Sequence, residues 1–264
     1  MDETSLLIAR FRELSDRAYK RGHETMTGFL SLSEQNVFFD WLKKEGIEAE
    51  TGKCRGSFFA FLGGHEESDR KILLFSPEPL DSARKAEIEK EAIACLLLTP
   101  KSIKYADRLT HRDYLGALMN LGYERKEFGD ILTDGTLGYL FLAKPIAEDV
   151  KESLVRVKHT PISASLLPPG SCPFVFRFQE KRITLAHNRI DAIIKEAFDL
   201  SRRDSQEKIG KEEVFVDGRT IKDNSYRVKA GQRISVRGKG KFIYIGDEKE
   251  TRKNRIATTI KIYC

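Results

Sequence analysis

Positively charged residues are concentrated in the C-terminal third of this sequence. Residues 181–264 hold 21 Lys and Arg against 12 Asp and Glu, a net charge of +9, whereas the preceding residues carry a net charge of −3. A basic segment joined to a mildly acidic body is typical of a module that binds a polyanion. The basic residues alternate with Val, Ile and Phe at strand spacing instead of following one amphipathic helix. This pattern favours nucleic acid over an anionic membrane surface.

Two of these basic residues occupy a position that could bind phosphate. Arg202 and Arg203 follow Ser201, a predicted helix N-cap, so both would stand in the first turn of a helix. Helix N-termini and Arg or Lys side chains bind phosphates without reading base sequence. The alternative is that the basic residues form only a solvated charged face.

No catalytic or metal-binding pattern is present in the sequence. The four cysteines, Cys54, Cys95, Cys172 and Cys264, are far apart and lack the Cys and His spacing that zinc requires. His111-Arg112-Asp113 is similar to the HRDLxxxN loop of protein kinases, but Leu118 stands where that loop has Asn. We therefore predict no catalytic residue, no metal and no cofactor.

The N-terminal part of the chain is predicted to be an α/β unit. Apolar residues at three- and four-residue intervals predict one helix that ends near Gly22 and a second helix with Ser33 as its N-cap. Residues 57–62 and 71–75 have the composition of short strands. The unit spans residues 1–75.

Residues 76–167 are predicted to alternate strand, helix, strand, strand, helix, strand. This βαββαβ order is typical of the ferredoxin-like, RRM-like sandwich, in which two helices cover one face of a sheet. Tyr139 and Phe141 would share one sheet face, but the first strand has no matching aromatic residue, so packing is favoured over base stacking. Possible RNA contacts in this middle domain are His111, Arg112 and Arg125, although a structural role in the helix start after Thr110 is favoured for the His111 segment.

The remaining residues are predicted to form a linker and a C-terminal domain. Residues 168–180 begin with a stretch rich in Pro and Gly that can continue neither a strand nor a helix, so they are the predicted linker. Residues 181–264 would then form the C-terminal domain. Two short helices are expected to begin near Arg189 and Arg202, followed by a strand and a hairpin.

Residues 189–240 resemble the αL RNA-binding motif of the small-subunit ribosomal protein S-four, bacterial tyrosyl-tRNA synthetases and many pseudouridine synthases. The family pattern, RLDxxL, then LSRxxAQxLIxxGxVxVNG, then VxxGDxIxVRGxG, matches this stretch with departures at Lys208, Glu212 and Asp217. The resemblance implies that residues 181–264 are an αL RNA-binding domain with a basic tail. The predicted RNA contacts are Arg189, Ser201, Arg202, Arg203, Gln206, Lys208, Lys211, Arg219, Arg237, Lys239 and Lys241.

A longer resemblance covers most of the chain and is weakest over residues 1–70. Residues 109–122, with Arg125 and residues 129–132, are similar to the signature of the bacterial YlmH family. The resemblance implies a non-catalytic protein that binds rRNA and tRNA on the large ribosomal subunit. It also implies a role in rescue or quality control of stalled translation. The start Met1-Asp2-Glu3, without a basic flank or an apolar stretch, predicts a cytoplasmic location.

Two other classes of protein stay open at this point. The first is an RNA-modifying enzyme that uses the αL domain only for docking. It would need a catalytic Asp motif or a glycine-rich cofactor loop in residues 1–165, and neither is found. The Arg189-Ile190-Asp191 segment is similar to the GRLD segment of pseudouridine synthases, but its predicted helical position argues against catalysis. The second class is a basic interaction protein of the division or membrane apparatus, and no apolar run approaches the ~18 residues of a membrane span.

Overall fold

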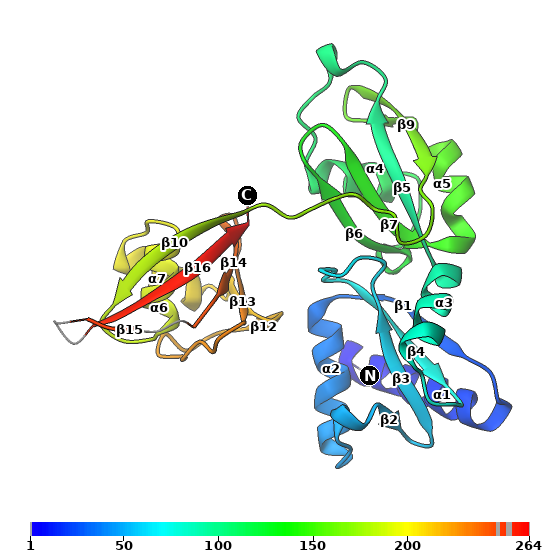
Figure 1. Cartoon of the computed structure of the whole chain (residues 1–264), viewed down its shortest axis with the longest axis horizontal. Coiled ribbons are helices and arrows are strands. Elements are labelled where there is room, and N and C mark those ends of the chain that lie inside the picture. The colour runs from blue at the N-terminus through cyan, green and yellow to red at the C-terminus, as the bar shows by residue number, and fades with distance from the viewer. Residues whose placement is uncertain (1, 247–248, 252–254, 264) are drawn as a thin grey trace. The chain divides into compact units, whose positions relative to one another are not determined.

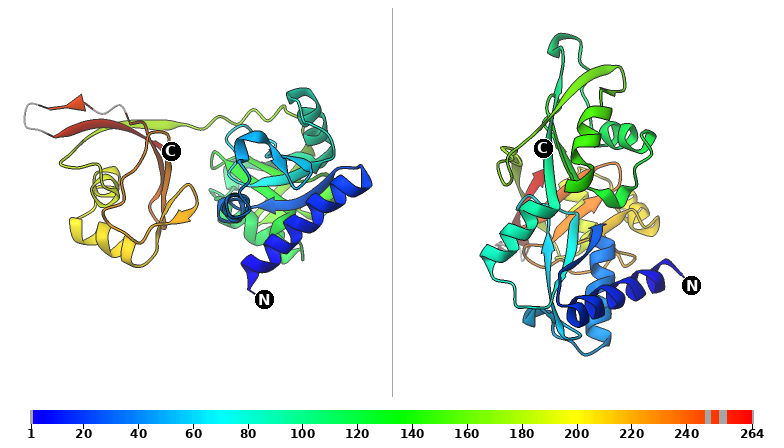
Figure 2. Two further views of the ribbon diagram at one scale, coloured as in Figure 1. Left: turned by 90° about the horizontal axis from the view of Figure 1, so that it is seen from below. Right: turned by 90° about the vertical axis from the view of Figure 1, so that its right-hand side faces the viewer.

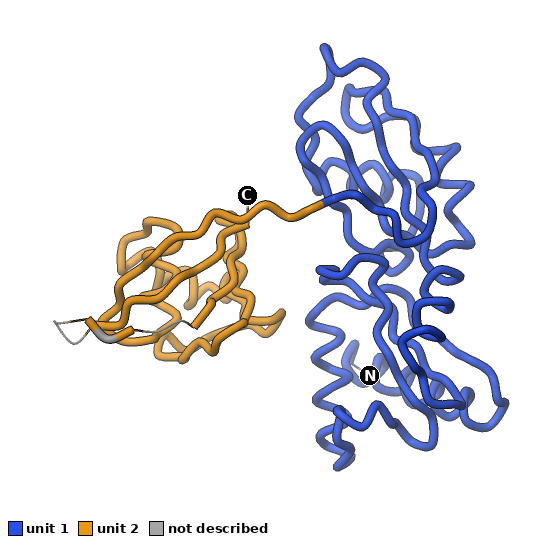
Figure 3. The backbone as a smooth tube through the Cα atoms, in the orientation of Figure 1, with its two compact units in different colours: residues 1–174 blue, residues 175–264 orange. Residues whose placement is uncertain are grey.

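The computed structural model describes residues 2–246, 249–251 and 255–263. The chain divides into two compact units, Met1–Phe174 (unit 1) and Val175–Cys264 (unit 2), which Figure 3 distinguishes by colour. Helices and antiparallel sheets build both units (Figure 1), so the predicted α+β fold class is confirmed. None of the helices in the described ranges is long and apolar enough to cross a membrane.

The first half of unit 1 is a four-stranded sheet with two helices packed on it, in the sheet order β1-β4-β3-β2. Its elements are α1 (Glu3–Arg21), β1 (Thr25–Leu30), α2 (Leu32–Lys44), η1 (Ala49–Thr51), β2 (Lys53–Cys54), β3 (Ser57–Leu62) and β4 (Lys71–Ser76). The predicted helix end at Gly22 is confirmed, because Gly22 is a left-handed C-cap with φ 66°. Ser31, not the predicted Ser33, caps α2, because Ser31 and Glu34 form a reciprocal capping box.

Aromatic side chains form the core of this first half. The ring of Phe38 on α2 is fully buried and lies edge-on to Phe11 of α1 at 5.3 Å and to Phe59 of β3 at 4.9 Å. Edge-to-face ring pairs are favourable beyond the apolar area that they bury. The two helices are thereby fixed to the sheet through one shared residue.

The second half of unit 1 has the predicted ferredoxin-like topology. Its elements are α3 (Ser82–Ala92), β5 (Ile93–Pro100), η2 (Ile103–Tyr105), α4 (His111–Asn120), η3 (Arg125–Glu127), β6 (Phe128–Thr133), β7 (Gly138–Ala143), η4 (Lys144–Ile146), α5 (Ala147–Ser153), β8 (Arg156–Val157) and β9 (Thr160–Leu166). The sheet order β6-β7-β5-β9-β8 puts the first and third main strands at the centre, as a split βαβ sandwich requires. Tyr114 of α4 and Val150 of α5 are fully buried in one core with the sheet.

The other face of this second sheet is covered by its neighbours within unit 1. Phe141 is 1% exposed, and its ring lies 6.1 Å from that of His65, in the loop after β3. The ring of Tyr139 packs against Phe174 at 5.8 Å. A side chain at Gly64 would come within 2.7 Å of the Phe141 ring, so the approach requires glycine. The expectation of packing, not base stacking, for Tyr139 and Phe141 is confirmed.

Unit 2 is an antiparallel sheet with α6 and α7 on one side, as the left view of Figure 2 shows. Its elements are β10 (Phe178–Leu185), α6 (Ile190–Ala197), α7 (Arg202–Gly210), β11 (Val214–Val216), β12 (Arg219–Thr220), β13 (Arg233–Val236), β14 (Gly240–Tyr244), β15 (Lys249–Glu250) and β16 (Ile256–Tyr263). The sheet order is β10-β16-β14-β13-β11-β12, with β15 beside β16. The two helices predicted near Arg189 and Arg202 are thus present.

The longest pairing in unit 2 joins its two ends. β10 pairs with β16 along its whole length, from Phe178 opposite Tyr263 to Leu185 opposite Ile256. β10 begins at Phe178, inside the segment 168–180 that the sequence predicts to be a linker. A strand therefore takes the last residues of that segment.

Candidate nucleic-acid interface

Helix α7 presents the central group of predicted contacts. Ser201 is its N-cap, and the Ser201 hydroxyl accepts a hydrogen bond from the backbone N–H of Asp204 at 3.0 Å. Ser205 and Ile209 anchor the helix because both are fully buried. The side chains of Arg202 and Arg203 are therefore held in the first turn, exposed to solvent.

The turn between β13 and β14 lies beside the C-terminal end of α7. The Lys208 ammonium donates to the carbonyl of Arg237 at 3.2 Å, and the Arg237 N–H donates to the carbonyl of Glu213 at 2.9 Å. These bonds place the exposed side chains of Arg237 and Lys239 next to the helix. We name this group the α7 surface, and it comprises Arg202, Arg203, Gln206, Lys211, Arg237 and Lys239.

The predicted cations fall into two groups by their partners. Arg202, Arg203, Arg237 and Lys239 make no ion pair with any residue in the described part of the chain. Lys211 pairs with Glu207 at 2.5 Å, which raises the pKa of Lys211, but both groups are exposed and such pairs contribute little. Lys208, in contrast, is mostly covered and bonds Glu213 at 2.9 Å, which lowers the pKa of Glu213. Lys208 therefore holds the turn in place.

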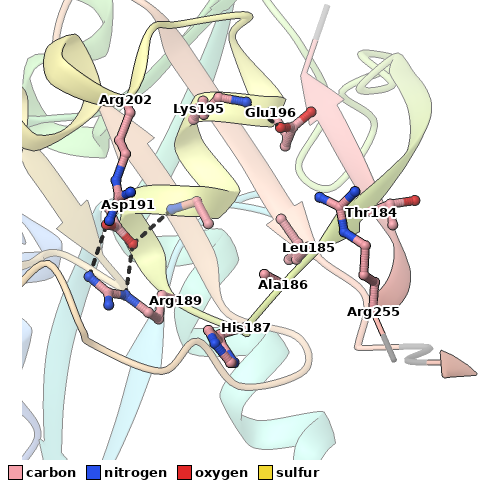
Figure 4. Close-up of a pocket in the computed structure, with 11 residues that line it drawn as sticks. Thr184, Leu185, Ala186, His187, Arg189, Asp191, Lys195, Glu196, Arg202 and Arg255 are labelled. Atoms are coloured by element: carbon pink, nitrogen blue, oxygen red, sulfur yellow. Dashed lines mark hydrogen bonds and ion pairs between the residues drawn. The ribbon is translucent and has the colours of Figure 1, made fainter. Parts of the chain in front are cut away.

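Arg189 is committed to a structural ion pair at the start of α6. Its guanidinium donates two hydrogen bonds to the Asp191 carboxylate, at 3.1 and 3.0 Å, as Figure 4 shows. The Asp191 side chain is 6% exposed and also accepts the N–H of Ala192 at 2.9 Å. The helical position expected for the GRLD-like segment is thus confirmed, and its carboxylate is occupied by the helix and by Arg189.

Replacing Asp191 with Ala should lower the free energy of unfolding of unit 2. The substitution leaves Arg189 partly covered without its bidentate partner and removes one of the two acceptors of the Ala192 N–H, which also donates to the Arg189 carbonyl, so we expect a loss of about 2 kcal/mol. Glu196→Ala is the matched control, because Glu196 pairs with its neighbour Lys195 through half-exposed side chains, and loss of this pair should cost under about 0.5 kcal/mol. Urea denaturation measures both. Equal effects of the two substitutions would contradict the role given to Asp191.

A pocket of about 370 Å³ opens beside this ion pair, between the end of β10 and the two helices. Arg189 and Arg202 line it together with His187, Lys195 and Arg255 (Figure 4). No sequence pattern singled out His187, Lys195 or Arg255 as a contact. They lie on separate segments without a shared motif, and only the pairing of β10 with β16 brings Arg255 toward α6.

The remaining two predicted contacts of unit 2, Lys241 and Arg219, lie away from the α7 surface. Lys241 and Phe242 are neighbours on β14, so their side chains point to opposite faces of the sheet. Phe242 is buried under the helices, and the Lys241 side chain therefore lies on the other face. Its ammonium stands 4.5 Å from the ring centroid of Tyr263 on β16. Arg219 is exposed on the edge strand β12.

The three possible RNA contacts of the middle domain, His111, Arg112 and Arg125, differ in whether their side chains are exposed. The Arg125 guanidinium donates to the carbonyls of Phe128 at 2.6 Å and Gly129 at 3.1 Å, and burial lowers its pKa to about 10. Arg125 therefore holds the start of β6. His111 and Arg112 are exposed in the first turn of α4, and Arg112 borders a hollow of about 560 Å³ that Arg156 and Lys158 also line.

This chain is similar to a family model, a curated relative and a solved structure. Residues 97–168 match the family model described as "Putative RNA-binding domain in YlmH". The "Ribosome-associated protein quality control protein P2" of Bacillus subtilis (strain 168) is 27% identical over 240 residues, which cover 89% of this chain and 86% of that protein. The solved structure of "Cell division protein ylmH from Streptococcus pneumoniae" aligns with a TM-score of 0.45 and 20% identity, over 64% of this chain and 93% of that chain.

The family model and the Bacillus relative confirm the resemblance to the YlmH family. Their descriptions name RNA binding and ribosome-associated quality control, and neither describes a catalytic activity.

Proposed function

We propose that this chain is a non-catalytic protein that binds rRNA and tRNA on the large ribosomal subunit, in the cytoplasm, through an αL domain in unit 2. Its role would be in rescue or quality control of stalled translation. The observation that carries the proposal is the α7 surface, with its four cations that lack ion-pair partners in the described ranges. The name of the Bacillus relative and the description of the family model support the choice of ribosomal RNA.

An existing ion pair raises the free-energy cost of bringing a cation into contact with phosphate. A side chain that is already ion-paired must give up its partner before it binds phosphate, whereas Arg202, Arg203, Arg237 and Lys239 exchange only water. Arginine also matches phosphate with two parallel hydrogen bonds. Structured RNA is recognised mainly through its shape, phosphates and 2′-hydroxyls, so such a surface can act without reading bases.

The match to the family model described as "Putative RNA-binding domain in YlmH" lies within unit 1, whereas the charge distribution favours unit 2. Residues 97–168 hold 10 Lys and Arg against 9 Asp and Glu, and this near balance supplies little long-range attraction for RNA. We therefore assign most of the affinity to unit 2. We assign a secondary contact to His111 and Arg112, beside Arg156 at the hollow on α4.

The affinity of the full chain for structured RNA should fall steeply with salt. If the four cations of the α7 surface that lack ion-pair partners among the described residues each neutralise one phosphate, the logarithm of the binding constant should fall with the logarithm of salt concentration with a slope of about −3 to −4. This slope corresponds to roughly a 100-fold loss between about 50 and 200 mM salt. Fluorescence anisotropy with a labelled RNA hairpin measures it, and a flat salt response would argue against phosphate binding.

Sedimentation with ribosomes tests the proposed partner. The chain should pellet with large subunits, and digestion of accessible rRNA with nuclease should release it. If it stays bound to nuclease-treated particles, its contacts are with ribosomal proteins. If it pellets with anionic lipid vesicles and not with ribosomes, the membrane alternative replaces the proposal.

A further inference from the structure

The sheet of unit 2 has a second face, opposite α6 and α7. Side chains alternate along each strand, and Ile183, Phe242 and Ile260 point into the core under the helices. Their neighbours on β10, β14 and β16 therefore point the other way. In the described part of unit 2, both helices lie on the core side, so no helix of this unit covers the second face (Figure 2).

Three aromatic rings gather at one end of this second face. Phe178 and Tyr263 are directly opposite each other on β10 and β16, with ring centroids 4.8 Å apart. Phe176, which precedes β10, lies 5.4 Å from the Tyr263 ring. Phe178 is 37% exposed, and Phe176 and Tyr263 are half-buried. The rings thus support one another and still present surface to solvent, and we name them the aromatic patch.

Cations share the second face with the aromatic patch. The Lys241 ammonium stands 4.5 Å from the Tyr263 ring centroid and 5.6 Å from that of Phe176. Arg182 and Lys261 point to the same face by strand alternation, and Glu180, which lies 3.5 Å from Lys261, is the acidic residue that shares it on β10. The charge of this face is therefore positive, which suits an anionic ligand and disfavours a purely apolar one.

Rings beside cations on a sheet face match the chemistry of single-stranded nucleic acid. An unpaired base stacks on an aromatic ring, and its phosphates reach the neighbouring Lys and Arg. The double-stranded parts of an RNA keep their bases paired and cannot use such rings. The aromatic patch and the α7 surface would therefore bind different parts of a folded RNA.

We propose that Phe178 and Tyr263, with Lys241 beside them, form a stacking site for an unpaired base of RNA. The proposal rests on the proposed function in taking RNA as the ligand, and it adds a second contact on the opposite face of unit 2. Lys241 then acts by holding the ring of Tyr263 in place and by meeting the phosphate next to the stacked base.

The test uses the full chain and two RNA probes, a blunt hairpin and the same hairpin with an unpaired 3′ tail of about six nucleotides. The natural sequence should bind the tailed probe about tenfold more tightly than the blunt one, because one stacked base contributes about that factor. Phe178→Ala should remove this gain and leave blunt-hairpin binding unchanged. Phe178→Tyr should keep the gain, and so should Val175→Ala, since Val175 is 77% exposed and outside the patch.

A spectroscopic readout tests stacking itself. In a Phe178→Trp variant, tryptophan fluorescence should be quenched by the tailed probe and not by the blunt one, while Trp41, 2% exposed in unit 1, gives a constant background. This variant retains a ring at the site, so the result does not depend on how well Phe178→Ala folds.

The outcomes separate this inference from the proposed function. Equal affinity of the natural sequence for both probes, or an equal effect of Phe178→Ala on both, would overturn the stacking site and leave the α7 surface intact. Arg202→Ala with Arg203→Ala should weaken both probes and leave their ratio unchanged. If the natural sequence binds neither probe, both proposals are wrong.

Discussion

Replacing Arg202 and Arg203 together with Ala is expected to lower the affinity of the full chain for structured RNA by roughly 100-fold. Both side chains are exposed in the first turn of α7 and have no ion-pair partner in the described ranges, so their donors are available to phosphate. Charge-assisted hydrogen bonds contribute about 1.5–3 kcal/mol each, and about 1.4 kcal/mol corresponds to a tenfold change in affinity. The slope of the salt dependence should become shallower by about two.

The same double substitution should leave the melting temperature unchanged or slightly raised. Cations in the first turn oppose the helix dipole, and only Asp204 compensates them there. Their removal therefore relieves an unfavourable interaction in the free protein. A structural role for these residues predicts the opposite, a lower melting temperature.

A matched control separates this local effect from total charge. Lys20→Ala with Arg21→Ala removes the same two charges from the exposed last turn of α1, in unit 1. This control should change RNA affinity by less than about threefold, since exposed charges that do not contact a phosphate are screened at physiological salt. If the control weakens binding as much as the α7 substitution does, RNA affinity depends on the net charge of the chain and not on contacts made by the α7 surface.

The elements that local sequence specifies were predictable. Gly22 ends α1, and Thr110 with Asp113 starts α4 through a capping box in which the Thr110 N–H donates to Asp113 at 2.8 Å. The ferredoxin-like order was also predictable, because hydrophobic periodicity changes from strand to helix along residues 93–166.

The strands that depend on distant partners were not predicted. β10 spans Phe178–Leu185 and has three consecutive charged residues, Glu180, Lys181 and Arg182, in place of the apolar alternation typical of a strand. Its pairing with β16, near the end of the chain, makes it a strand. β1 was missed because Gly28 interrupts a short segment between two helices. α3 was missed because it buries only Ile88 and so shows little hydrophobic periodicity.

In the candidate interface, the sequence predicts which residues are basic but not which acidic side chain each of them pairs with. Arg189 matches the motif, yet Asp191, two residues later, takes its guanidinium. Lys208 is likewise taken by Glu213. Lys241 is a different case: its alternation with the buried Phe242 already indicated the opposite sheet face, and that signal was not used.

Unit 2 by itself should bind structured RNA nearly as tightly as the full chain does. Its core, from Ile183 to Ile260, is formed by residues of unit 2, so the unit has the packing that an independently folding domain needs. The boundary matters, because a fragment that begins at Arg182 loses the first half of β10 and its pairing with β16. The fragment should therefore begin at Val175.

The most direct test of the account compares this fragment, residues 175–264, with residues 1–174 in binding one RNA hairpin at physiological salt. The account predicts that residues 175–264 bind within about threefold of the full chain and at least about 30-fold more tightly than residues 1–174, because the basic charge of the chain is concentrated there. Circular dichroism confirms that each fragment is folded. If folded residues 1–174 bind the hairpin as tightly as residues 175–264, or more tightly, the assignment of RNA binding to unit 2 is wrong.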